Sequence, residues 1–294
     1  MLNNLKQIYW RTKYTKGKNI FWFLRALYYQ VFTTLRPMIN GTIPHNLNGR
    51  LIISLTSYPP RFDKLFLTLK CLICQTVKPD EVILWVTKAD LSKLPKNVLQ
   101  LDETQLIRIK TTLDLGPGKK LIPALLEYKD SFIVTADDDI YYHKEWLRDL
   151  IAEFSNQKII IAHRVHEIKY DNGVIQPYNS WDFDVTTPLA LKNHFLTGGA
   201  GALFPPNCFY QEVSNAERYL KCTSKQDDIW IYWMLRMNHY KVKPSKSGFN
   251  LITWNGSDDN GLASANVGQD NNDIAIKRML DTFGDPNGNS IEKT

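Results

Sequence analysis

The segment Ser131-Phe-Ile-Val-Thr-Ala-Asp-Asp-Asp139 says more about the fold than any other stretch of this chain. A short apolar run ends abruptly in three carboxylates, which is typical of a buried strand that delivers acidic side chains to its carboxyl end. Ligands of open α/β sheets bind at that edge. Adjacent carboxylates repel one another, so the cluster is costly unless a cation lies close to it. A divalent ion that shares its ligands with a phosphate is the usual cation. We therefore expect a metal-dependent enzyme acting on a phosphorylated substrate.

Strand-like and helix-like segments alternate around this motif. Strands are predicted at residues 50–55, 81–86, 106–110, 132–136 and 159–162, and helices at 63–72, 121–128 and 146–154. Asp63 is expected to cap the first of these helices. The alternation predicts an α/β fold with a mostly parallel sheet covered by helices on both faces. We assign residues 49–255 to this domain.

The N-terminal extension, residues 1–48, differs from the rest of the chain in charge. The first acidic residue is Asp63, and nine Lys or Arg precede it, whereas the remainder carries 27 basic and 30 acidic side chains. Apolar and aromatic residues recur at helical spacing from Phe21 to Leu35. A basic amphipathic helix within residues 1–36 is typical of a helix that lies on an anionic membrane surface. Packing of the aromatic stripe on the main domain and binding of a protein partner are the alternatives.

Other features limit the class of protein. No secretory signal or transmembrane helix is visible, because the longest apolar stretch near the N-terminus, Ile20 to Leu24, is far shorter than the roughly 20 residues needed to span a bilayer. Basic charge confined to the extension argues against a nucleic-acid partner. Residues 256–294 are rich in Asn, Asp, Gly and Ser, and we expect one helix at 273–280 followed by a flexible tail.

Several segments occur in an order that is typical of one enzyme family. In one-letter code they are ISLTSYPPRFDKLFLTLKCLICQT, KPDEVILWV, LGPGKK, TADDDIYY, TGGAGALFPP and QDDIW. Over about residues 50 to 254 the chain resembles the GT-A glycosyltransferases, and most closely the family 2-like bacterial enzymes that make surface polysaccharides. The resemblance implies transfer of a sugar from a nucleotide-diphosphate, by default a UDP-sugar, with Mn²⁺ or Mg²⁺ as cofactor.

The resemblance also implies roles at the site of the nucleotide sugar. The acidic run corresponds to the family's D-x-D motif, so Asp139 and Asp137 are the implied metal ligands, and Asp137 and Asp138 contact the sugar nucleotide. The further candidates for sugar-nucleotide binding are Thr56, Arg61, Asp114, Lys119 and Lys120. The glycines at 116 and 118 allow close backbone approach to a ligand, and a lysine can hold a phosphate as a point charge. An ordinary exposed turn is the alternative for that segment.

An acidic pair opens a helix-like run at Gln226-Asp227-Asp228. Inverting members of the family carry such a pair here, which implies that Asp228 is the general base and Asp227 its neighbour. The reaction needs a carboxylate to accept the proton of the acceptor hydroxyl. Helix capping is the alternative, because Asp is favoured at an N-cap.

The acceptor site is expected near a segment of small residues, Thr197 to Ala202. The family places a loop of this kind beneath the sugar and the acceptor, which makes Gly198 and Gly199 acceptor-site candidates. A hinge or bulge is the alternative for these glycines. Trp181 is a candidate for stacking on the acceptor and could equally belong to the core.

Together these features predict an inverting glycosyltransferase that acts on a glycan or lipid-linked acceptor, in the cytoplasm and peripheral on the inner face of the cytoplasmic membrane. One alternative is a sugar nucleotidyltransferase, which would need a Gly-rich loop with Arg and Lys after the first strand. The chain instead reads Thr56-Ser57-Tyr58-Pro59-Pro60-Arg61 there. The other is a non-enzymatic, membrane-associated glycan-binding module, for which two intact acidic clusters would be unexplained.

Overall fold

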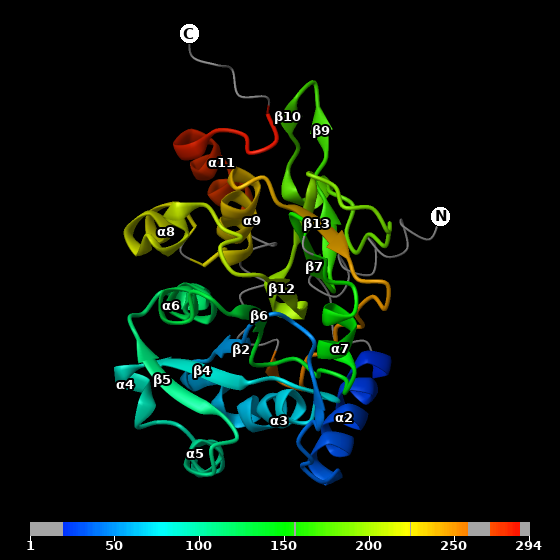
Figure 1. Ribbon diagram of the computed structural model, residues 1–294, viewed down its shortest axis with the longest axis vertical. Helices are drawn as coiled ribbons and strands as arrows, with labels where there is room; N and C mark the ends of the chain where they lie inside the picture. The colour runs from blue at the N-terminus through cyan, green and yellow to red at the C-terminus, as the bar shows by residue number, and fades with distance from the viewer. Residues whose placement is uncertain (1–19, 156, 224, 258–270, 289–294) are drawn as a thin grey trace.

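A seven-stranded sheet in the order β13-β7-β12-β6-β2-β4-β5 forms the centre of the computed structural model, which describes residues 20–155, 157–223, 225–257 and 271–288 (Figure 1). Its strands are β2 (Leu51–Thr56), β4 (Glu81–Thr87), β5 (Arg108–Thr112), β6 (Phe132–Ala136), β7 (Ile159–Ala162), β12 (Ala202–Phe204) and β13 (Lys241–Pro244). β12 runs antiparallel to both of its neighbours, and the other pairings are parallel. The predicted, mostly parallel α/β sheet is confirmed.

Helices cover both faces of this sheet because its central strands are buried on both sides. In β2, Leu51, Ile53 and Leu55 face one side and join one apolar cluster, whereas Ile52 joins another. The first cluster includes side chains of α3 (Phe62–Ile73), α5 (Lys96–Glu103) and α7 (Trp146–Ile151). The second includes side chains of α6 (Ile122–Glu127) and α9 (Asp227–Met237). Near-continuous apolar strands are what such a two-sided arrangement requires.

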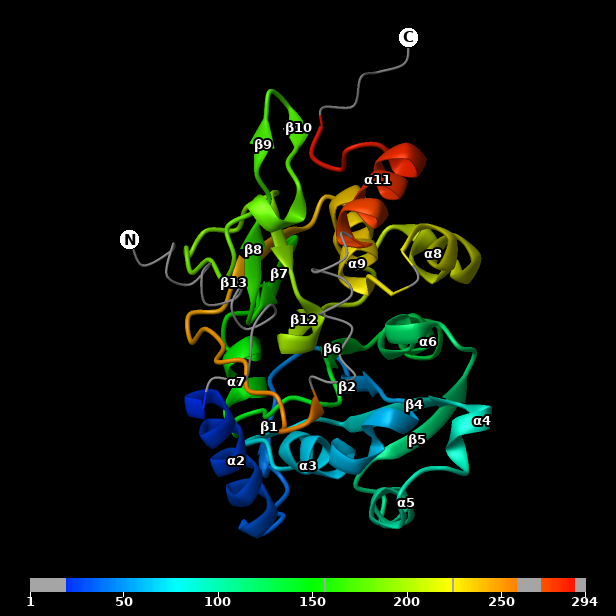
Figure 2. The same ribbon diagram turned by 180° about the vertical axis from the view of Figure 1, so that it is seen from behind.

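A third apolar cluster lies around α9 and holds the C-terminal part of the chain. It joins α9 to α8 (Ala216–Cys222) and α11 (Asn271–Phe283), beside the small pairings of β8 with β11 and β9 with β10 (Figure 2). These short strands are β8 (Val165–Glu167), β9 (Tyr170–Asp171), β10 (Val174–Ile175) and β11 (His194–Leu196). A further parallel pair joins β1 (Ile43–Pro44) to β3 (Val77–Lys78).

Some predicted boundaries are wrong for local reasons. β5 begins two residues later than expected, and α7 ends at Ile151 rather than at 154. Asp63 does not cap α3, because the 3-10 turn at residues 59–61 runs directly into the helix and leaves Arg61 at the N-cap. Asp63 therefore lies in the first helical turn, where it pairs with Lys64.

Both terminal regions contribute a helix. α2 (Ile20–Leu35) lies beside α3 in both views (Figures 1 and 2), and residues 1–19 of the predicted extension fall outside the described residues. α11 is longer than the predicted helix at 273–280. After it, the Gly284 carbonyl accepts a hydrogen bond from Trp233, and Asn287 contacts Tyr170 and Tyr232. Residues 258–270 and 289–294 are outside the description. Within the described ranges, no helix is both long enough and apolar enough to cross a membrane.

Candidate active site

The acidic run Asp137, Asp138 and Asp139 comes directly after β6, whose residues 132–136 are all buried. β6 pairs in parallel with β2, so the turn after β2 reaches the same edge of the sheet. The three aspartates therefore lie at the carboxyl end of a buried strand, as the sequence predicted. The chemistry of this edge depends on the side chains that meet the three carboxylates.

Arg61 and Ser57, both from the turn after β2, hold two of the three aspartates. Arg61 Nη1 forms an ion pair with Asp139 Oδ2 and lies 3.5 Å from Asp138 Oδ1. Ser57 Oγ donates a hydrogen bond of 2.5 Å to Asp138 Oδ2. Burial, reinforced by the charge of Asp139 and opposed by Arg61, raises the pKa of Asp138 to about 7. Arg61 thus supplies part of the positive charge that the three carboxylates require.

Lys120 joins the two acidic motifs, although about ninety residues separate them in the sequence. Its Nζ is 2.7 Å from Asp137 Oδ1 and 3.0 Å from Asp227 Oδ2, and its side chain is only 4% exposed. Burial disfavours the lysine charge, but the attraction of Asp137, Asp227 and Asp228 outweighs it and raises the pKa of Lys120 well above its ordinary value. Lys120 is therefore a charged centre that holds carboxylates together.

Asp228 meets the small-residue loop and does not cap α9. The backbone N–H of Gly198 donates a hydrogen bond of 2.8 Å to Asp228 Oδ1. The N-cap of α9 is Gln226, without a side-chain capping bond, and both aspartates lie in the first turn. Burial and the charge of Asp227 raise the pKa of Asp228 to about 7, against the attraction of Lys120. A carboxylate with a pKa near neutrality is suited to act as a general base.

The glycines of the small-residue loop allow both acidic motifs to approach the backbone. A Cβ placed on Gly199 would lie 1.9 Å from Asp137 Oδ2, and one placed on Gly198 would lie 3.1 Å from Asp228 Oδ1. Tyr142 fixes this contact, because its hydroxyl donates to the Gly199 carbonyl at 2.5 Å and accepts from the Asp137 N–H at 2.7 Å. The loop is a site of close backbone approach in the 3-10 conformation at Gly198–Ala200.

The remaining predicted residues of the sugar-nucleotide site lie toward β4 and β5. Lys119 Nζ is 3.0 Å from Asp114 Oδ1. Hydrogen bonds from Thr87 and Lys93 lower the pKa of Asp90, and the charge of Lys119 adds a smaller contribution in the same direction. Thr56, at the end of β2, donates its hydroxyl to a backbone carbonyl of β4. Lys119 and Lys120, adjacent in sequence, therefore serve different clusters.

Trp181 does not reach the site. The structure places it fully buried, with its indole N–H donating 2.8 Å to the Gln176 carbonyl and its ring against Tyr178 and Phe195. The core interpretation of this residue is the correct one, because an acceptor could not stack on a ring without exposed surface.

The acidic run forms only part of a site for a divalent ion. Among the described residues, no group of three or more His, Cys, Asp or Glu is arranged to hold an ion. Mg²⁺ is commonly held by one or two carboxylates together with substrate phosphates, and not by a cage made only of protein. Asp137 offers hard oxygen ligands on a side chain that is 39% exposed, and Asp139 lies two residues further on. Asp139 is engaged by Arg61, so Asp137 is the accessible carboxylate of the run, and an ion held here would need further ligands from a substrate phosphate.

Sequence reasoning missed several residues that shape the site. Tyr219 accepts a hydrogen bond from the Gly118 N–H, and a Cβ on Gly118 would lie 2.6 Å from its ring. Trp146 donates to the Ala200 carbonyl at 2.7 Å. Ser57 and Tyr142 stand within or beside the quoted motifs and could have been found by their position. Tyr219 carries no such signal, because it contacts Gly118 across about a hundred residues.

Comparisons with known proteins find distant structural likenesses. No protein-family model matches the sequence, and no curated protein does. The mannosyltransferase PcManGT from Pyrobaculum calidifontis, in complex with GDP-Man and Mn²⁺, is 15% identical with a TM-score of 0.43, over 83% of this chain and 66% of that one. Glucosyl-3-phosphoglycerate synthase from Mycobacterium tuberculosis, in complex with Mn²⁺, UDP and glucosyl-3-phosphoglycerate, is 12% identical with a TM-score of 0.42, over 82% of each chain.

A nucleotidyltransferase is found at the same level of similarity. The inositol-1-phosphate CTP transferase from T. maritima is 11% identical with a TM-score of 0.41, over 80% of this chain and 98% of that one. The chain thus spans just under two thirds of the mannosyltransferase and nearly all of the CTP transferase. Likenesses of this size do not decide what this chain does, so its chemistry depends on the geometry of its own residues.

Proposed function

We propose that the protein is a glycosyltransferase of the GT-A type, which moves a sugar from a nucleotide-diphosphate to a hydroxyl of an acceptor. The observation that carries the proposal is the bridge made by Lys120, which holds Asp137 at the carboxyl end of β6 and Asp227 at the start of α9. The bridge brings an edge suited to a phosphorylated ligand next to a carboxylate suited to accept a proton.

Asp228 is the proposed general base. Its pKa of about 7 leaves a substantial fraction of the carboxylate ionised at neutral pH. As the acceptor oxygen attacks the anomeric carbon, its proton passes to Asp228 and the bond from that carbon to the diphosphate oxygen breaks. A single displacement of this kind inverts the anomeric configuration. The Gly198 N–H fixes the orientation of Asp228, and Asp227 stays paired with Lys120.

The sugar nucleotide is proposed to lie along the carboxyl edge of the sheet. Asp137 and Asp139 would hold a Mn²⁺ or Mg²⁺ ion, which would neutralise the charge that builds up on the leaving diphosphate. Arg61 holds Asp139 and Asp138 in place. Asp114 and Lys119, toward β5, are the proposed contacts to the rest of the nucleotide. The absence of a side chain at Gly199 lets the backbone of the small-residue loop approach Asp137 Oδ2 closely.

The proposed acceptor is a glycan or a lipid-linked sugar, as the sequence resemblance implies. The corresponding setting is the synthesis of a bacterial surface polysaccharide at the inner face of the cytoplasmic membrane. The order of the motifs supports the acceptor class, and the basic N-terminal extension supports the setting.

Release of nucleotide from a panel of UDP-, GDP-, CMP- and dTDP-sugars, with Mn²⁺ or with EDTA, tests the proposal. We expect slow, metal-dependent hydrolysis of one sugar nucleotide without acceptor. Asp228→Asn should reduce transfer by about 10²- to 10⁴-fold, the usual contribution of a general base. Asp63→Asn, an exposed acid of α3, is the matched control and should leave the rate unchanged.

Two outcomes would contradict the proposal. Full transfer activity in Asp228→Asn would remove Asp228 from the role of base. Release of pyrophosphate from a nucleoside triphosphate and a sugar phosphate, with no turnover of any nucleotide sugar, would favour the nucleotidyltransferase alternative.

A further inference from the structure

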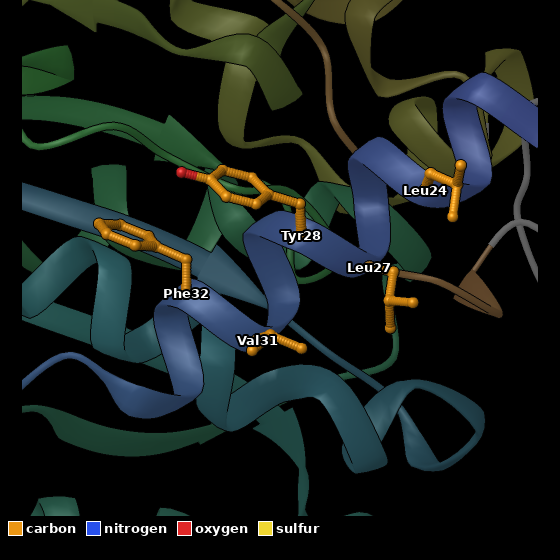
Figure 3. Close-up of a pocket in the computed structure, with 5 residues that line it drawn as sticks. All are labelled: Leu24, Leu27, Tyr28, Val31 and Phe32. Carbon is orange, nitrogen blue, oxygen red and sulfur yellow. The ribbon is translucent and has the colours of Figure 1, made fainter.

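α2 turns its apolar side to solvent, whereas an ordinary surface helix turns that side to the core. The apolar stripe that the sequence places at helical spacing is exposed, with Leu24 at 55%, Tyr28 at 63% and Leu35 at 78% of their possible surface. Leu27, Val31 and Phe32 lie between them and, with Leu24 and Tyr28, line a shallow hollow with almost no polar atoms (Figure 3). We call these six residues the α2 face. Folding of the domain leaves this apolar surface in water, where it is unfavourable.

The side of α2 that packs on the domain is the more polar one. Thr33 is fully buried beside Cys71, and the carbonyl of Thr34 accepts a hydrogen bond from Lys70 of α3. Tyr29 packs against Tyr141 with their ring centroids 4.4 Å apart. The domain therefore fixes the rotation of α2 about its own axis and points the α2 face outward. Contiguous exposed apolar surface of this kind marks an interaction site.

The charge around the α2 face identifies its partner. Arg25 and Arg36 lie on or directly after α2, five further Lys or Arg occur in residues 1–18 of the sequence, and no acidic residue precedes Asp63. A second copy of the chain would bring the same basic charge to the contact, and like charges oppose such an association. A partner complementary to the α2 face and its basic surroundings must offer both apolar groups and negative charge. An anionic lipid bilayer has these properties.

We propose that α2 docks the protein on an anionic lipid bilayer, lying in the plane of the interface with the α2 face inserted among the lipids. The proposal is independent of the proposed chemistry, since it uses no residue of the candidate active site. Tyr141, which Tyr29 of α2 contacts, lies two residues after Asp139, and Trp254 joins Tyr141 to the backbone of Asp139. Docking would therefore bring the bilayer close to the acidic edge of the sheet.

Co-sedimentation of the full-length protein with vesicles tests the proposal directly. The probes are vesicles of phosphatidylcholine alone and vesicles that also contain phosphatidylglycerol. We expect binding to the anionic vesicles, weakened as NaCl rises from about 0.1 to about 0.5 M because salt screens the basic charge. The triple variant Leu24→Gln/Tyr28→Gln/Leu35→Gln should bind at least about ten-fold more weakly.

A matched control uses exposed apolar residues far from α2 in the sequence. Val174 and Leu189 are 63% and 60% exposed, and the variant Val174→Gln/Leu189→Gln should bind vesicles as the unchanged protein does. Circular dichroism and urea unfolding check that each variant folds. If the triple variant does not fold, the single variant Leu35→Gln, whose side chain is 78% exposed, takes its place in the same comparison.

Three results would overturn the proposal. The first is that the protein binds neither kind of vesicle. The second is that the triple variant and the control lose binding equally. The third is that the protein forms a dimer without lipid and that the triple variant abolishes this dimer. The last result would assign the α2 face to self-association, and sedimentation velocity would detect it. Nucleotide-sugar turnover enters none of these measurements, so failure here leaves the proposed chemistry untouched.

Discussion

The cluster around Lys120 and the α2 face both depart from the usual distribution of side chains, in which charged groups are exposed and apolar groups are buried. Around Lys120 the lysine and Asp227 are buried, and Asp137, Asp227 and Asp228 attract the lysine charge. On α2, large apolar side chains remain exposed, and the basic residues nearby have no acidic neighbours in the sequence. Burial of charge and exposure of apolar surface both cost stability, so they persist where something besides folding requires them. The comparison points to function at both places.

The largest expected effect concerns the buried charges. Replacement of Lys120 by Met would leave Asp137 and Asp227 without their shared cation. Removal of one partner of a buried ion pair costs about 3–5 kcal/mol, so we expect a loss of this size in the free energy of unfolding, measured with urea. Lys93→Met removes the exposed partner of Asp90 and should cost less than about 1 kcal/mol.

A second substitution shows whether the cost arises from the uncompensated acid. Adding Asp227→Asn to Lys120→Met should recover part of the lost stability, because one carboxylate no longer needs a cation. Purely additive losses in the double variant would mean that Lys120 stabilises the fold by packing rather than by charge.

The next effect in size comes from the close approach at Gly199. A methyl group in Gly199→Ala would meet Asp137 Oδ2 at 1.9 Å, so the carboxylate would have to rotate away from Lys120. We expect a loss of about 1–3 kcal/mol in unfolding free energy, together with loss of turnover. Gly288→Ala, whose added methyl would find its nearest atom at 3.4 Å, is the control. Unchanged stability in Gly199→Ala would show that the loop yields without strain.

The pH dependence of stability reports on Asp228. Its pKa is about 7 in the folded protein, against an ordinary 3.8, so the folded state retains a proton that the unfolded chain loses between these values. The stabilisation is therefore complete below about pH 4 and is lost as the pH rises through about 7, with a slope of at most about 1.4 kcal/mol per pH unit. Asp138, whose pKa burial likewise raises to about 7, contributes a similar slope, so Asp228→Asn should remove about half of the slope in urea unfolding measured from about pH 5 to about pH 8. Over the same range, turnover should rise with pH as the base loses its proton. A stability profile that is equally steep in Asp228→Asn would assign the proton to another group.

The smallest effect is expected on the α2 face. Leu35→Gln should change the free energy of unfolding by less than about 0.5 kcal/mol, because the side chain is 78% exposed. Leu72→Ala, in the core side of α3, should cost about 2–5 kcal/mol in the same urea experiment. A large loss in Leu35→Gln would mean that the α2 face is covered within the protein and is not a docking surface.

Local pattern alone predicted the elements that carry the site. The apolar run before Asp137 predicted β6 to the residue, and the helical spacing from Phe21 to Leu35 predicted α2. The antiparallel strand β12 was not predicted. Only three residues form it, so the period of its side chains gives too little signal. Asp63 was wrongly taken as a cap because the turn residues before α3 already continue into the helix.

The sequence by itself determined that carboxylates end a buried strand, that a second acidic pair opens a helix, and that basic charge gathers in the N-terminal region. Only the tertiary structure decided that Lys120 turns inward to join the two acidic motifs, that Trp181 belongs to the core, and that the α2 face points outward. The physical reason is the range of the interactions. Side-chain period and chain direction are local, whereas the partner of a charge or of an apolar stripe depends on segments that meet only after folding.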